Sequence, residues 1–237
     1  MVTPVRQKPI AYTMSGKNLC LRLLPAVFAA LSPSQLMAAD PQQVTTTGNK
    51  LELEKMADTG KLRLVVRTKG YAESRSQLLQ QANQNDAHIV SEPLTASIET
   101  VLVSDEGSGS KLIGTNHLAD MGIDVDLALA LGQTQVLKGL PPLPSPADFA
   151  SGVVVSPQID YIASMLFASG WDELDAALSG RLVAAVPSDD QIMLANISSD
   201  EMYERFKVYA ASAFDEANRS VSKALLVRQN GRWVETE

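Results

Sequence analysis

The segment RLVAAVPSDDQIMLANI, residues 181–197, constrains the fold more than any other part of the chain. Two runs that are apolar at nearly every position flank the sequence Pro187-Ser188-Asp189-Asp190. Continuous apolar strands are covered on both faces, so the segment predicts a hairpin inside a core. Because Pro-Ser-Asp-Asp is typical of turns, we interpret Asp189 and Asp190 as a solvated bend and not as a site.

Local signals predict further strands and hairpins. Strands are expected at 61–68, 98–104, 111–114 and 153–155. Near the end of the sequence, Asn230-Gly231 lies between two apolar runs, which is the strongest short signal for a hairpin.

Helix boundaries are also visible in the sequence. A helix is expected over 72–84. Gly122 can end a short helix, and Asp124 can cap a longer one that follows. A helix over 170–180 would be closed by Gly180. Ser198 and Glu201 fit a capping box before a last helix. That helix is expected to bury one stripe, formed by Met202, Phe206, Tyr209, Ala210 and Ala213.

These elements predict an α+β fold of antiparallel β-hairpins with helices packed on one side. Residues 139–148 contain four prolines and form an irregular connection. This stretch is the best internal boundary, between an N-terminal α+β part at 61–140 and a C-terminal hairpin, helix and hairpin part at 150–237. It fits equally well as one surface loop inside a single domain.

The first 39 residues have the order of a secretory signal peptide. Four basic residues and no acid precede an apolar run at 23–31, and the small pair Ala38-Ala39 follows. The run is well short of the roughly 20 residues that span a bilayer. We therefore expect cleavage near Ala38-Ala39, a polar linker over 40–60, and a periplasmic or secreted protein. Translation can start at Met1 or at Met14.

The charge distribution excludes some partners. Residues 1–39 hold four of the 20 basic residues and none of the 27 acids, so the remainder carries a net charge of −11. Such a charge argues against binding to nucleic acid and to anionic membranes. The only cysteine, Cys20, lies within the predicted signal, so the mature chain has to be held by packing alone.

No pattern in the sequence points to a metal or a cofactor. His88 and His117 are isolated, whereas a zinc site needs three or four converging ligands. Asp120, Asp124 and Asp126 resemble part of a calcium loop, but the remaining ligand positions are alanines, and helix capping explains these acids better. We therefore expect no metal and no cofactor.

Candidates for a site are few. Ser108 lies in a Gly-Ser-Gly-Ser stretch that differs from a nucleophile elbow and is expected in a turn. Tyr161, Ser164, Asp189 and Asp190 remain as weak binding candidates, and no catalytic residue can be assigned. Adjacent acids on a turn rarely provide the two separated carboxyls that acid–base catalysis needs.

Several stretches of the chain share a pattern with a known family. They are 98–114, 118–130, Leu140-Pro141, Tyr161 with Ala163-Ser164, 182–197 and 224–234. In this order they resemble the YtpQ-like family, a bacterial domain of unknown function. The resemblance implies a fold and brings no activity, cofactor or catalytic set. This chain differs by its predicted signal and by apolar residues at Ile162 and Met165.

The absence of a catalytic pattern favours an exported, non-catalytic interaction or accessory protein with an unknown protein partner. Two alternatives stay open: an exported hydrolase with a dispersed active site, and a protein that binds a small ligand or a cation. A concave pocket that holds a carboxylate of raised pKa would favour the enzyme. A flat apolar patch around Trp171 or Trp233 would favour the interaction protein, although both are expected to pack in the core or at an edge.

Overall fold

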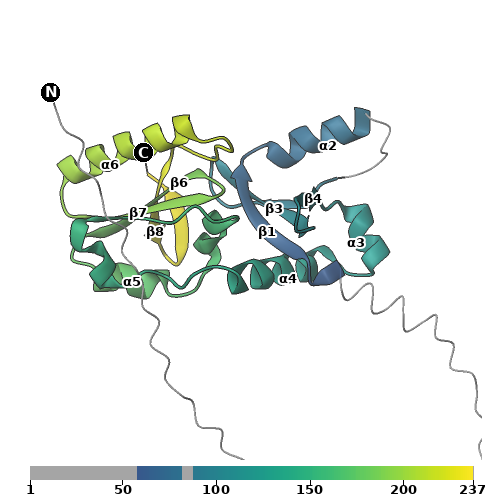
Figure 1. Cartoon of the computed structure of the whole chain (residues 1–237), viewed down its shortest axis with the longest axis horizontal. Coiled ribbons are helices and arrows are strands. Elements are labelled where there is room, and N and C mark those ends of the chain that lie inside the picture. Colours follow the sequence, from purple (N-terminus) through teal and green to yellow (C-terminus); the bar gives the residue numbers. More distant parts are fainter. Residues whose placement is uncertain (1–57, 82–87, 237) are drawn as a thin grey trace, which may run out of the picture. The chain divides into compact units, whose positions relative to one another are not determined.

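The computed structural model describes residues 58–81 and 88–236, which belong to one compact unit. Within these residues the chain forms two antiparallel sheets, with helices interspersed among the strands (Figure 1). The predicted α+β class is therefore confirmed. The predicted signal peptide at 1–39 and most of the linker at 40–60 lie outside the described residues. No helix in the described ranges has the length and apolarity that crossing a membrane requires.

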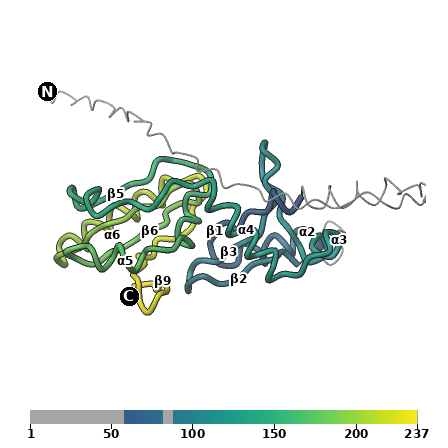
Figure 2. Tube along the Cα trace, turned by 90° about the horizontal axis from the view of Figure 1, so that it is seen from below, coloured from purple at the N-terminus to yellow at the C-terminus, as the bar shows by residue number. Residues whose placement is uncertain are grey.

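The first sheet lies in the N-terminal half of the described chain. Its elements and their flanking helices are β1 (Leu62–Thr68), α2 (Tyr71–Gln81), β2 (Ser91–Pro93), β3 (Ile98–Asp105), β4 (Ser110–Leu112), α3 (Thr115–Met121) and α4 (Val125–Lys138). Strands β1 and β3 pair antiparallel along their length, with Leu64 opposite Leu102. Both β2 and β4 also pair with β3, and β1, β3 and β2 lie side by side in Figure 2.

The second sheet follows the proline-rich connection. Its elements are η1 (Pro146–Ser151), β5 (Val153–Val155), η2 (Ile162–Phe167), α5 (Trp171–Ala177), β6 (Arg181–Ser188), β7 (Gln191–Ile197), α6 (Asp200–Glu216), β8 (Leu225–Gln229) and β9 (Arg232–Glu235), where η marks a 3-10 helix. The strand order is β5-β7-β6-β8-β9. The predicted hairpins β6–β7 and β8–β9 are both present. Asn230 and Gly231 adopt positive φ in the second turn, as a two-residue hairpin requires.

Helices cover both faces of the second sheet, which differs from the one-sided arrangement predicted. Val183, Ala185 and Met193 face α6 and pack against its Phe206. The alternate residues of β6 and β7 face α5 and the 3-10 helices. This two-sided cover is the physical reason why the strands are apolar at nearly every position, and it confirms the buried hairpin predicted for 181–197.

The first sheet is covered in the same way. Leu62 and Leu102 pack against α3 and α4 on one face. On the other face, Val65, Val101 and Val103 pack against α2. Each sheet is therefore the middle layer between helices, and its strands contribute side chains to clusters on both faces.

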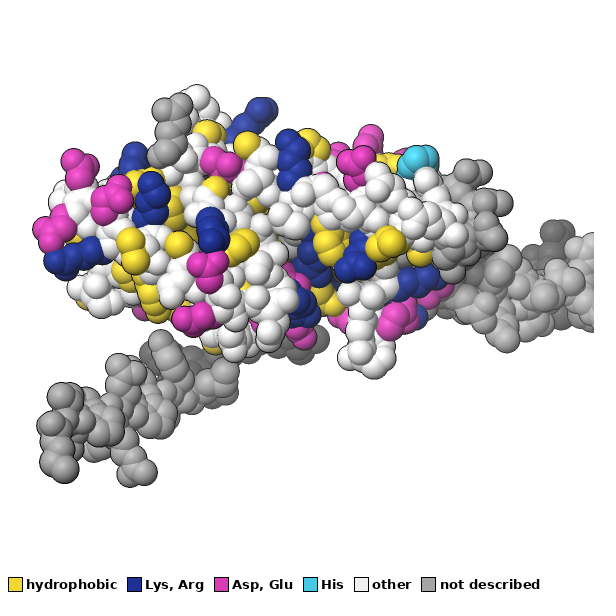
Figure 3. All heavy atoms as spheres, turned by 90° about the horizontal axis from the view of Figure 1, so that it is seen from above, with side chains coloured by type: hydrophobic (Ala, Val, Ile, Leu, Met, Phe, Trp, Pro, Cys, Tyr) yellow, Lys and Arg dark blue, Asp and Glu magenta, His cyan; other side chains and the backbone are white. Residues whose placement is uncertain are grey.

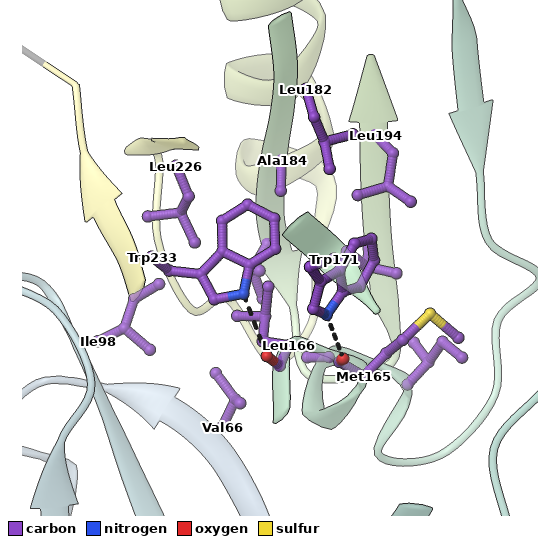
Figure 4. Packing of buried hydrophobic residues seen from close by; sticks show 14 of the residues in the cluster. Val66, Ile98, Met165, Leu166, Trp171, Leu182, Ala184, Leu194, Leu226 and Trp233 are labelled. Carbon is purple, nitrogen blue, oxygen red and sulfur yellow. Dashed lines mark hydrogen bonds between the residues drawn. The ribbon is translucent and has the colours of Figure 1, made fainter. Parts of the chain in front are cut away.

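The largest cluster joins the two sheets and contains both tryptophans (Figure 4). Trp171 and Trp233 are buried, with ring centroids 5.2 Å apart and an edge-to-face angle of 74°. Their indole N–H groups donate to the carbonyls of Met165 and Leu166 at 3.0 and 3.1 Å. Val66 of β1 and Ile98 of β3 pack into the same cluster. Core packing, one of the two placements expected for the tryptophans, is the one observed.

Some helix boundaries differ from the prediction. Gly122 and Asp124 act as predicted, the first as a left-handed cap and the second by accepting from Leu127 N at 2.7 Å. The helix expected to close at Gly180 ends at Ala177, because Leu178 already has extended backbone angles. The cap of α6 is Ser199, which accepts from Met202 N, and not Ser198.

The buried stripe predicted for the last helix is narrower than expected. Phe206 and Ala210 are buried, and Met202 and Ala213 pack against the same cluster. Tyr209 is instead 52% exposed. It lies at the margin of the face that α6 turns toward the sheet, so its ring is only partly covered.

Candidate functional site

The Asp189–Asp190 pair forms the turn between β6 and β7, as predicted, but it is not a solvated bend. Asp189 is only 2% exposed. Its Oδ2 lies 2.7 Å from Nη1 of Arg67, which is on β1 of the first sheet. The expectation of solvation fails because the end of a buried hairpin points into the molecule, and here it meets a strand of the other sheet.

A second arginine reaches the same carboxylate. Nε of Arg219 lies 2.8 Å from Oδ1 of Asp189, an ion-pair contact whose alignment is poor for a hydrogen bond. Arg219 follows α6, and backbone pairing of this segment with the end of β6 holds it in place. Ser220 forms a bridge with Ser188, and Val221 N donates to Pro187 O at 2.9 Å.

The backbone of the turn also fixes the segment before η2. Ile159 N donates to Asp190 O at 3.4 Å, and Ala163 N donates to Asp189 O at 3.3 Å. Tyr161 lies between these contacts with φ at 65°, in the left-handed region that costs a non-glycine residue about 1 kcal/mol or more. The turn therefore positions Tyr161 as well as the two arginines.

Burial dominates the protonation of the two central groups. It raises the pKa of the Asp189 carboxyl, because Arg67 and Arg219 only partly oppose it and Asp190 raises it further. Burial also raises the pKa of the Tyr161 hydroxyl, and the nearby carboxylates of Asp105 and Asp160 add to the effect. Tyr161 therefore stays protonated at neutral pH and can donate a hydrogen bond.

Arg67, Tyr161 and Arg219 border a pocket with a cavity volume of about 750 Å³. Its described lining consists of Arg63, Arg67, Asp105, Gly107, Ser108, Gly109, Ser110, Gln135, Val136, Lys138, Gly139, Leu140, Asp160, Tyr161 and Arg219. We call it the arginine pocket after Arg63, Arg67 and Arg219. Four cationic side chains and two carboxylates are in this set, and Asp189 and Asp190 pair with its arginines from outside the lining.

On the pocket side, other carboxylates make only long contacts with Arg63 and Arg219. Nε of Arg63 lies 3.8 Å from Asp105. Nη2 of Arg219 lies 3.3 Å from Asp160 and 3.7 Å from Asp190, and its side chain is 55% exposed. Pairs that are this long or this exposed contribute little free energy. An incoming anion can therefore replace them, while buried Asp189 keeps Arg67 and Arg219 in position.

The structure brings together three of the four residues that the sequence singled out. Tyr161 lines the pocket, and Asp189 and Asp190 contact its Arg219. Ser164 lies elsewhere: it is fully buried, and its hydroxyl donates to Leu64 O at 2.9 Å. That bond joins η2 to β1, so Ser164 has a structural contact and no access to the pocket.

Sequence reasoning missed the arginines. Arg63 and Arg67 appear in the sequence only as the polar positions of a strand, and Arg219 as part of a polar loop. The one available signal was the apolar character of 182–195, which implies that the turn inside it is buried and needs a partner of opposite charge. Nothing local identifies that partner.

Other predicted features lie away from the pocket. His117 accepts from Gly114 N through Nδ1 at 3.1 Å at the start of α3. Within residues 58–81 and 88–236, no group of three or more His, Cys, Asp or Glu could hold a metal ion. Both tryptophans are buried, so the apolar surface patch considered around them is not formed.

Comparison of the chain with protein-family models, with curated proteins and with solved structures gives no match.

Proposed function

We propose that this chain is an exported, non-catalytic binding protein that takes a small anionic ligand in the arginine pocket. The observation that carries the proposal is the fixation of two guanidinium groups, Arg67 and Arg219, by one buried carboxylate at the wall of an open cavity. Planar guanidinium groups bind carboxylates and phosphates through paired N–H donors. Protonated Tyr161 supplies a further donor.

This proposal takes up the small-ligand alternative in place of the interaction protein that the sequence favoured, which stays a prediction. The hydrolase and the cation-binding protein are less well supported. Asp189 has the raised pKa expected of a catalytic carboxyl, but it lies behind the arginines and is almost completely buried, so it cannot reach a substrate. A cation site is disfavoured by the excess of arginine and lysine in the lining. Kinship with the YtpQ-like family remains a proposal that rests on the sequence pattern.

The test is calorimetric titration of the purified chain with inorganic phosphate, acetate and succinate, with acetamide as an uncharged probe. The proposal expects at least one anion to bind and acetamide not to bind. Arg219→Gln should weaken that binding about tenfold, which corresponds to about 1.4 kcal/mol. Because Arg219 is half exposed but also pairs with buried Asp189, the free energy of unfolding of the variant is measured beside its affinity.

Arg205→Gln is the matched control, because Arg205 is an exposed arginine on α6 that pairs with Glu201 outside the pocket. Equal effects of the two substitutions, or tighter binding of calcium than of any anion, would show that the pocket is not an anion site.

The proposed export rests on the order of residues in 1–39. Fractionation of host cells, followed by measurement of the intact mass, tests it separately. A periplasmic or extracellular protein beginning near Asp40 is the expected result. Full-length protein in the cytoplasm would contradict export and leave the ligand proposal in place.

A further inference from the structure

A second hollow adjoins the arginine pocket. It has a volume of about 300 Å³, lies between α2 and β4, and we call it the α2 groove. Arg67 and Ser110 line both the groove and the arginine pocket. The two spaces are therefore neighbours that share part of their lining.

The α2 groove combines apolar and cationic side chains. Leu78, Leu79 and Leu112 supply apolar surface, and Leu78 is 53% exposed although it is a large aliphatic residue. The guanidinium groups of Arg67 and Arg75 lie 5.7 and 5.2 Å from the ring centroid of Tyr71. Figure 3 shows basic and apolar side chains next to each other on the part of the surface that carries α2.

Apolar packing continues from the groove to the pocket. Leu79, Leu112, Tyr71 and Tyr161 all pack against the buried cluster between α2 and the first sheet. Tyr161 also lines the arginine pocket. The ring of Tyr161 thus belongs to the apolar surface, and Arg67 is the cationic residue common to the groove and the pocket.

We propose that the ligand is an anionic amphiphile, specifically an aliphatic carboxylate. Its head group pairs with Arg67 and Arg219 in the arginine pocket, and its alkyl chain lies in the α2 groove against Leu78 and Leu79. The inference rests on the proposed function and adds the class of ligand. Charge complementarity at the shared Arg67 and the exposed Leu78 beside partly buried Leu79 together select this occupant over a small polar anion.

The test compares straight-chain carboxylates from butanoate to decanoate by calorimetric titration of the full chain. Affinity should rise about two- to fourfold for each added methylene that becomes buried. Leu78→Gln should flatten this dependence on chain length and leave butanoate binding unchanged. Leu127→Gln is the control, since Leu127 is 48% exposed on α4 and does not line the groove.

The outcomes separate the two proposals. If anions bind but affinity does not change with chain length, the amphiphile is wrong and the anion pocket stands. If no anion binds, both are wrong. Equal chain-length dependence in Leu78→Gln and Leu127→Gln would mean that the alkyl chain binds elsewhere. Octyltrimethylammonium binding as tightly as octanoate would overturn the role of the arginines.

Discussion

The side chain of Asp189 is almost completely buried. Arg67 and Arg219 only partly offset the free-energy cost of removing its charge from water. Burial raises the pKa of its carboxyl in the folded protein. The folded state therefore holds this proton more tightly than the unfolded chain does. In the unfolded chain an aspartate has a pKa of about 3.9. The stabilisation by protonated Asp189 is complete below that unfolded value and is lost as the pH rises through the raised, folded value.

Asp189→Asn removes this titration and keeps the shape of the side chain. We expect the wild-type protein to lose stability relative to Asp189→Asn as the pH rises from about 4 to about 7. The measurement is the free energy of unfolding of both proteins by urea denaturation across this range. If the wild type instead gained relative stability with rising pH, the attraction of Arg67 and Arg219 would outweigh burial, and the pKa of Asp189 would be lowered and not raised.

At the scale of elements, the features that could be predicted are those that depend on residues close together in the chain. Asn230-Gly231 sets a hairpin through its own backbone angles, and Asp124 caps α4 through a bond three residues away. Ser198 and Ser199 both fit a cap, and the choice depends on the chain path out of β7, which the pattern does not contain. The arginine pocket could not be predicted, because Arg67 and Arg219 meet Asp189 only after distant segments pair.

Gly180 shows how a tertiary contact can resemble a helix stop. A Cβ at this position would lie 2.4 Å from the carbonyl oxygen of Ile197 and 2.6 Å from Oδ1 of Asn196. We expect Gly180→Ala to destabilise the fold by about 2–3 kcal/mol, because backbone atoms have to move apart.

The thermal midpoint of Gly180→Ala, measured beside that of Gly109→Ala, checks this expectation. A Cβ at Gly109 would meet no atom within 4 Å, so its substitution should be close to neutral. Equal thermal midpoints for the two variants would mean that the connection between α5 and β6 can shift without a loss of stability.

At the scale of the whole molecule, Glu235 on β9 ties the second sheet to the first. Its Oε1 accepts from Ser97 N at 2.6 Å, and from the hydroxyls of Ser97 at 2.8 Å and Thr95 at 2.5 Å. Both residues, Thr95 and Ser97, lie in the loop between β2 and β3. Partial burial alone would raise the pKa of Glu235, but these bonds and the charge of Lys69 outweigh it and lower the pKa.

A lowered pKa means that Glu235 stabilises the fold at pH values above its unfolded pKa, and that this contribution disappears as the pH falls through the folded pKa. Glu235→Gln should cost about 1 kcal/mol at neutral pH, the difference between a charged and a neutral acceptor. The difference in the free energy of unfolding between this variant and the wild type should disappear at acidic pH. Urea denaturation at neutral and acidic pH measures it, with Glu204→Gln on the exposed face of α6 as the control. A difference in the free energy of unfolding that persists at acidic pH would mean that altered packing, and not the lost charge, causes the destabilisation.

The edge-to-face pair of Trp171 and Trp233 also determines what intrinsic fluorescence can report. These are the two tryptophans of the chain, and both lie in the cluster that joins the sheets. Their emission is therefore that of a shielded indole pair, and it moves to longer wavelength only when this core opens. Neither ring lines the arginine pocket or the α2 groove. Tryptophan emission should therefore change on unfolding and not on ligand binding in the pocket or the groove. For each substituted protein, it distinguishes a loss of structure from a loss of binding.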